Sequence, residues 1–246
     1  MTLDNLLHAA QREPARTAPL PDMLMAGAAG PLGAEILRRL AGGHHYGHIR
    51  VLSQEPITPA VQRVQIINVP PENPNKWPLA SATVGVIVLD APTLANDRER
   101  ALWTPDPQLL APLASWMLRS GVQTLAVVVP HDQGRLPQAL KAGLANLDEQ
   151  AVANMGFERL LLVRPAAAPH VPAHGNALEW LAHRMLSIVE YMVPTNEMPP
   201  RAADVAALVD VALREMPPGV HIAPPELARR SSEATVQETV RAWLAP

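Results

Sequence analysis

The chain has 246 residues, of which 48% are hydrophobic, 17% charged and 3% aromatic, and its formal net charge is −3. This length and composition predict one globular domain with an aliphatic core, because single α/β domains often reach about 250 residues. A small negative charge without a long Lys/Arg run argues against nucleic acid and anionic membrane surfaces as partners. The absence of cysteine excludes disulfides, thiolate metal sites and cysteine nucleophiles.

The first 22 residues are predicted to stand apart from the main domain. Residues 3–12 carry apolar side chains at helical spacing, and the Pro-containing stretch 13–22 is typical of a linker. This region lacks the apolar segment, about 7–15 residues long, that a signal peptide needs. No apolar run in the chain approaches the ~20 residues that cross a bilayer as a helix. We therefore expect a cytoplasmic protein without membrane insertion.

From residue 23 onward, short apolar segments alternate with helical patterns. Runs rich in Val, Ile and Leu without strict alternation are typical of strands buried on both faces. The predicted strands are Met23–Ala26, Ile49–Leu52, Val64–Val69, Val84–Leu89, Leu125–Val129 and Leu160–Val163. Helices are predicted to begin at Pro31 and at Asp106-Pro107, and a third covers Pro137–Met155. The alternation predicts α/β architecture, a doubly wound parallel sheet of the Rossmann type, in one domain over residues 23–246.

The pattern changes after Pro165. Helices are predicted at Ala177–Met192, Ala202–Glu215 and Glu233–Leu244, with one short strand candidate at Val220–Ile222. We expect residues 166–246 to form a small, mostly helical lid over the carboxyl edge of the sheet, where ligands bind in such folds.

The strongest motif is a glycine-rich turn, Gly27-Ala28-Ala29-Gly30-Pro31-Leu32-Gly33, between a predicted strand and a predicted helix. In a dinucleotide-binding fold the first glycine permits the sharp turn, the second lets the backbone approach the pyrophosphate, and the third lets the helix pack closely. Free N–H groups at the helix start would bind the phosphates without a basic side chain. The motif predicts binding of NAD or NADP at Gly27, Ala29, Gly30, Pro31, Leu32 and Gly33.

Gly30 is the position at which we expect the backbone to come closest to the pyrophosphate. We expect it on a surface turn outside the core, where a φ above zero would add a cost to any substitution. A Val at this position should then abolish dinucleotide binding while the fold largely survives.

The turn has the spacing GxxGxxG, and the chain resembles the atypical short-chain dehydrogenase/reductases, in particular the branch of Tat-interacting-protein-like reductases. Further landmarks of the likeness are Val88–Pro92, Met155–Pro165 and Arg201–Ala206. The resemblance implies that the ribose of the cofactor is bordered by Asp90, Ala91 and Pro92, and that Pro165 and Ala166 lie near the nicotinamide. For Arg164 a cofactor contact and a salt bridge to a helix are both open.

The choice between NAD and NADP is made at the end of the second strand, where an acidic residue binds the ribose hydroxyls and a basic one binds the 2′-phosphate. The sequence there is Leu52-Ser53-Gln54-Glu55. Ser53 is compatible with either cofactor, and Glu55 would disfavour a phosphate if it points inward, so the choice stays open. Asn68, at the end of the third strand, stands where the resemblance implies an adenine contact.

The family's catalytic pattern is absent. Short-chain reductases use a Tyr and a Lys four residues later, because the Lys lowers the pKa of the Tyr. The chain has only Tyr46 and Tyr191, and neither has a Lys at that spacing. The remaining catalytic candidates are His131, which Asp132 could orient, and Lys141. No metal site is predicted, because the histidine pairs of the chain are interpreted as surface loops.

Three functions are compatible with these observations. The leading hypothesis is a dinucleotide-binding protein that has lost the Tyr-Lys chemistry and works as a binding, regulatory or assembly component. The alternative is an active NAD(P)H-dependent oxidoreductase with a different proton donor, acting on a small-molecule substrate. The third is an interaction scaffold with an empty pocket, whose N-terminal helix docks on a protein partner or on another copy in an oligomer.

Overall fold

Seven parallel strands form one sheet in the order β3-β2-β1-β4-β5-β6-β7. A computed structural model describes residues 19–58, 62–71, 73–90, 102–130, 147–165, 200–231 and 235–245. The strands are β1 (Met23–Ala26), β2 (Ile49–Ser53), β3 (Val64–Asn68), β4 (Val84–Val88), β5 (Thr124–Val128), β6 (Arg159–Val163) and β7 (Gly219–Ala223). The strand order reverses between β1 and β4, which is the arrangement of a Rossmann fold. The predicted fold class is confirmed, and the short strand candidate is β7.

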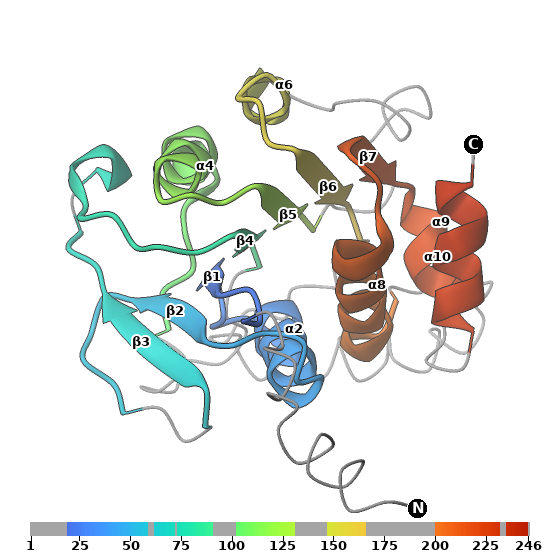
Figure 1. Ribbon diagram of the computed structural model, residues 1–246, viewed down its shortest axis with the longest axis horizontal. Coiled ribbons are helices and arrows are strands. Elements are labelled where there is room, and N and C mark those ends of the chain that lie inside the picture. The colour runs from blue at the N-terminus through green and yellow to red at the C-terminus, as the bar shows by residue number, and fades with distance from the viewer. Residues whose placement is uncertain are drawn as a thin grey trace, which may run out of the picture.

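Helices cover both faces of the sheet, with α4 (Leu110–Arg119) and α6 (Leu147–Ala153) on one side and α2 (Pro31–Gly42) and α8 (Ala202–Glu215) on the other (Figure 1). Successive β1 side chains enter the two cores in turn: Met23 and Met25 lie on the α2 side, and Leu24 and Ala26 on the α4 side. Every β1 residue is fully buried. This two-sided burial explains why the strands lack polar alternation.

The C-terminal part of the chain contributes directly to the layer that contains α2. Helix α8 lies against α2, and α10 (Val236–Leu244) and the short α9 (Pro225–Arg230) lie against α8. Residues 166–199, which include the helix expected at 177–192, lie outside the described residues, as do residues 1–18 with the expected N-terminal helix. The lid therefore stays a prediction. Within the described ranges, no helix combines the length and apolar character needed to cross a membrane.

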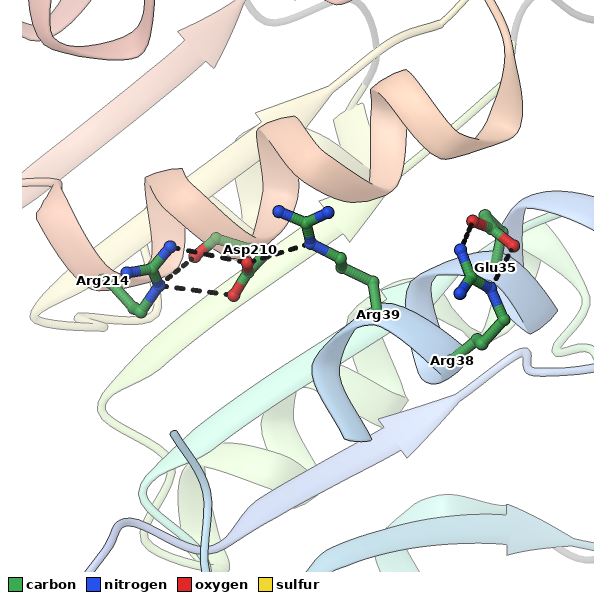
Figure 2. Close-up of polar contacts among 5 residues, drawn as sticks. All are labelled: Glu35, Arg38, Arg39, Asp210 and Arg214. Atoms are coloured by element: carbon green, nitrogen blue, oxygen red, sulfur yellow. Dashed lines mark hydrogen bonds and ion pairs between the residues drawn. The ribbon is translucent and has the colours of Figure 1, made fainter. Parts of the chain in front are cut away.

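A buried carboxylate joins α8 to α2. Asp210 of α8 is only 3% exposed. Arg39 of α2 donates from Nε to its Oδ2 at 3.3 Å, and Arg214, one turn along α8, donates from Nε to its Oδ1 at 3.3 Å (Figure 2). A buried carboxylate is tolerated only when such partners compensate its lost hydration. The cluster therefore fixes the C-terminal half of α2 against α8.

A tryptophan cluster covers the sheet where the chain crosses from β3 to β4. In the described residues of this crossing, the only helical element is the 3-10 turn η1 (Pro74–Lys76). Trp77 follows it and contacts Trp103 and Trp116 edge to face, with ring centroids 5.5 and 5.4 Å apart. The indole Nε1 of Trp116 donates to the backbone oxygen of Pro78 at 3.1 Å. Three of the five tryptophans thus do the packing that a crossover helix would otherwise do.

We expect Trp77→Ala to lower the free energy of unfolding by about 3–5 kcal/mol, because it removes a buried ring and two aromatic contacts. Denaturant unfolding followed by circular dichroism measures this. Leu79→Ala is the matched control two residues away, since Leu79 is 61% exposed and its loss should change stability by less than about 0.5 kcal/mol. Equal effects of the two substitutions would contradict the cluster's structural role.

Candidate functional site

The glycine turn lies at the carboxyl edge of the sheet, at the point where the strand order reverses. It connects β1 to α2, and β1 pairs with β2 on one side and β4 on the other. This is where open α/β sheets bind their ligands. Gly30 is the N-cap of α2 and has no side chain to cap the helix, and the first turn of α2 has no acidic residue. Backbone N–H groups and the positive end of the helix dipole therefore meet at the turn.

The first and third glycines are required by the backbone that surrounds them. Gly27 has a φ of +86°. A Cβ on Gly27 would lie 1.8 Å from the backbone oxygen of Val88 in β4, and a Cβ on Gly33 would lie 1.9 Å from the backbone oxygen of Gly27. Real Cβ contacts are never this short. The turn is therefore wedged between β4 and α2, and these two positions accept only glycine without a shift of the main chain.

Gly30 differs from our expectation. Its φ is −79°, so it does not need the left-handed conformation, and it is buried, not on a surface turn. An added Cβ would lie 2.4 Å from the backbone oxygen of Asp90. Gly30→Val would therefore displace the chain after β4, and it cannot test ligand binding independently of the fold. The expectation was wrong because the segment that closes over Gly30 is distant in sequence.

Asp90, two residues after β4, reaches the start of α2. Its Oδ2 accepts a hydrogen bond from the backbone N–H of Leu32 at 2.8 Å. Its backbone oxygen accepts one from the hydroxyl of Thr104 at 3.3 Å, and Trp103 accepts one from the N–H of Gly27 at 3.2 Å. Burial raises the pKa of Asp90, and the hydrogen bond from Leu32 opposes this effect. The carboxylate thus caps α2 from outside the helix.

The other predicted cofactor residues lie along the same edge. Ser53, at the end of β2, is fully buried; its hydroxyl donates to the backbone oxygen of Glu55 at 2.6 Å and accepts the N–H of Glu55 at 3.2 Å. Asn68 is exposed and pairs in register with Ser53. Pro165 is buried two residues after the end of β6. Ser53 therefore shapes the turn after β2. Glu55 in this turn and Asn68 at the end of β3 are exposed at the surface of the protein.

Arg164 forms a buried ion pair with Glu149 of α6. Its Nε donates to Oε1 at 3.1 Å, its Nη2 contacts Oε2, and both side chains are 2% exposed. The two-point geometry compensates both charges for their lost hydration. Of the two interpretations left open for Arg164, the structure shows the salt bridge to a helix. This pair fixes α6 to the end of β6.

Several predicted residues lie outside the described part of the chain, namely Ala91, Pro92, His131, Asp132, Lys141, Ala166 and Tyr191. Their roles stay predictions. Tyr46 is described and is 5% exposed. It precedes β2, so it lies toward the amino edge of the sheet, opposite the glycine turn, and burial raises its pKa. Tyr46 therefore cannot donate a proton at the carboxyl edge.

The raised pKa of Asp90 predicts a pH-dependent effect of Asp90→Asn on stability. An unfolded Asp has a pKa of about 3.9, so the folded protein binds this proton more tightly than the unfolded chain does. The resulting contribution to stability is present below the unfolded pKa and is lost as pH rises through the folded pKa. Asn removes the ionisation and keeps an acceptor for Leu32. We expect Asp90→Asn to raise Tm at pH 7, with a gain that shrinks toward pH 4.

Thermal melts between pH 4 and pH 8 measure this effect. Asp106→Asn is the matched control, because Asp106 also accepts a backbone N–H, from Gln108 at 2.8 Å, but is exposed. If Asp90→Asn is less stable than the parent at pH 7 and regains stability on acidification, the prediction is wrong.

Solved structures that match most of this chain include two enzymes of one bacterium. The chain covers 94% of its length on the Bordetella bronchiseptica enzyme WbmG, solved in complex with NAD, at 15% identity and a TM-score of 0.50, and spans 81% of that protein. On WbmH from the same organism, solved with NAD⁺, it covers 92% of its length and 84% of that protein, at 10% identity and a TM-score of 0.50. No protein-family model and no curated protein matches the sequence. At these identities the likeness establishes the Rossmann fold.

Proposed function

We propose that this chain binds a nicotinamide dinucleotide at the glycine turn and works as a binding, regulatory or assembly component without Tyr-Lys catalysis. The observation that carries the proposal is the start of α2, which the glycine turn places at the reversal of the strand order. Gly27 and Gly33 bring β1, β4 and the start of α2 into contact at the strand reversal, and α2 begins there with no acidic residue in its first turn. Such a helix start is an anion site that suits a pyrophosphate.

The comparison with WbmG and WbmH supports the same ligand class. Both proteins hold NAD in their solved structures and share the fold of this chain over most of its length. The binding edge of a Rossmann sheet is set by strand order, which is common to the fold. Dinucleotide binding at this edge is therefore the function that the topology favours.

The tyrosine content supports a role without the family's proton-transfer chemistry. Tyr46 is buried toward the opposite edge of the sheet, and neither Tyr46 nor Tyr191 has a Lys four residues on. A bound dinucleotide would then act as a ligand that stabilises or signals a state of the protein. A hydride transfer in this chain would need a proton donor of a different type.

A charge placed at the start of α2 tests the site without disturbing the glycines. Pro31 is exposed in the first turn of α2. Pro31→Glu should leave the fold intact, because an acidic residue at a helix N-terminus is stabilising. It should weaken NADH binding about 10-fold or more through repulsion of the pyrophosphate. Titration with NADH, followed by nicotinamide fluorescence, measures the Kd.

Pro107→Glu is the matched control, because Pro107 is an exposed proline at the start of the 3-10 helix η2 (Pro107–Leu109). It should bind NADH as the parent does. The proposal fails if the parent shows no saturable binding of NADH or NADPH, or if Pro31→Glu binds as tightly as Pro107→Glu.

We further expect NADH to bind more tightly than NADPH. The segment after β2, Gln54–Thr58, contains no Lys or Arg to pair with a 2′-phosphate, and Glu55 is exposed there. A 2′-phosphate would meet a like charge, while ribose hydroxyls would meet an acceptor. Comparison of the two Kd values in one buffer checks this, and tighter binding of NADPH would overturn it.

A further inference from the structure

We propose that Asp90 is an internal competitor of the dinucleotide, holding the start of α2 in the free protein and leaving it when the pyrophosphate binds. This inference rests on the proposed function, because it concerns the same site. It assigns to Asp90 a role that sets affinity, whereas the resemblance implies only that Asp90 borders the ribose.

The geometry places the carboxylate where the pyrophosphate is expected. Oδ2 accepts the N–H of Leu32 at 2.8 Å. This N–H belongs to the first turn of α2, whose N–H groups have no acceptor within the helix. The same Oδ2 lies 2.6 Å from the position that a Cβ on Gly30 would take, and the backbone oxygen of Asp90 lies 2.4 Å from it. The approach over Gly30 is therefore closed by backbone as well as by side chain, and the group in competition is the N–H of Leu32. A carboxylate oxygen and a phosphate oxygen cannot both accept this N–H in the same place.

The charges around Asp90 make coexistence unfavourable. The glycine turn and the first turn of α2 contain no charged residue, and the segment Leu102–Pro105 on the other side contains none. The nearest acidic residue along α2 is Glu35, which pairs with Arg38 on the helix surface (Figure 2). Among the described residues, burial and the hydrogen bond from Leu32 account for the shift in the pKa of Asp90, and no cation contributes to it. Two anions side by side without a cation repel each other.

The position that Asp90 occupies is also easy to leave. Burial raises the pKa of Asp90, so the ionised carboxylate is held there at the cost of its hydration. The backbone of Asp90 is fixed separately, through the hydrogen bond from Thr104 to its carbonyl oxygen. Rotation of the side chain toward solvent therefore restores hydration without moving β4. The N–H of Leu32 then passes from the carboxylate to the ligand and keeps an acceptor in both states.

A pair of ligands separates competition from other effects of Asp90. ADP-ribose contains the adenosine and the pyrophosphate of the dinucleotide, and adenosine lacks the pyrophosphate. We expect Asp90→Ala to bind ADP-ribose about 10-fold more tightly than the parent, and to show no such gain for adenosine, which lacks the charged group. Asp90→Asn keeps an acceptor for Leu32 but loses the charge. Its affinity for ADP-ribose should lie between those of the parent and Asp90→Ala. Isothermal titration measures the Kd values, and Asp106→Ala is the control that should match the parent.

Each other outcome is decisive. Asp90 variants that bind ADP-ribose with the parent's affinity would overturn the competition while the proposed function stands. Weaker binding by both Asp90 variants would show that Asp90 contacts the ligand directly. An equal gain for adenosine would show a general loosening of the site and not a competition with the pyrophosphate. If neither ADP-ribose nor NADH binds the parent or either Asp90 variant, the proposed function fails and this inference fails with it.

Discussion

The complete burial of β1 is the constraint on which the rest of this structure depends. Its four residues are fully buried and enter two different cores, so β1 must lie inside the sheet, here between β2 and β4, with helices on both sides. The chain that follows such a strand can leave the sheet only at the carboxyl edge. The turn that follows it is therefore confined between β4 and α2. The site begins as a consequence of packing, before any ligand is considered.

Helix α2 connects this confined turn to the opposite, amino edge of the sheet. At its start, Leu32 donates to Asp90 from the segment after β4; near its end, Arg39 reaches Asp210 of α8. Both partners are carboxylates, but their surroundings differ. Asp210 has two arginines and is fixed, whereas Asp90 has one backbone N–H. The helix is thus held firmly at one end and by a replaceable contact at the other, which is where a ligand would need room.

Local sequence patterns were sufficient for the strands, because each strand's hydrophobicity depends on its own burial. The runs at Met23–Ala26 and Leu160–Val163, and the helix at Ala202–Glu215, appear in the structure at or within one residue of the predicted bounds. The details of the site were not predictable in this way. In the site, Asp90 closes over Gly30 and accepts the N–H of Leu32, and these contacts join residues far apart in the chain. The same is true, outside the site, of the ion pair between Asp210 and Arg39. A single sequence without contacts does not contain that information, and the tryptophan cluster was missed for the same reason.

The crowding at Gly27 and Gly33 also limits what the presence of these glycines in related sequences can show about function. The atom that would collide at each position is Cβ, which every other amino acid shares, so no choice of rotamer or smaller side chain relieves the overlap. Selection for folding alone would retain both glycines in a descendant that had stopped binding any nucleotide. Retention of these two glycines is therefore evidence for the fold and not for nucleotide binding. Pro31 and Asp90, which the fold does not dictate so strictly, are the positions whose drift would reveal a change of use.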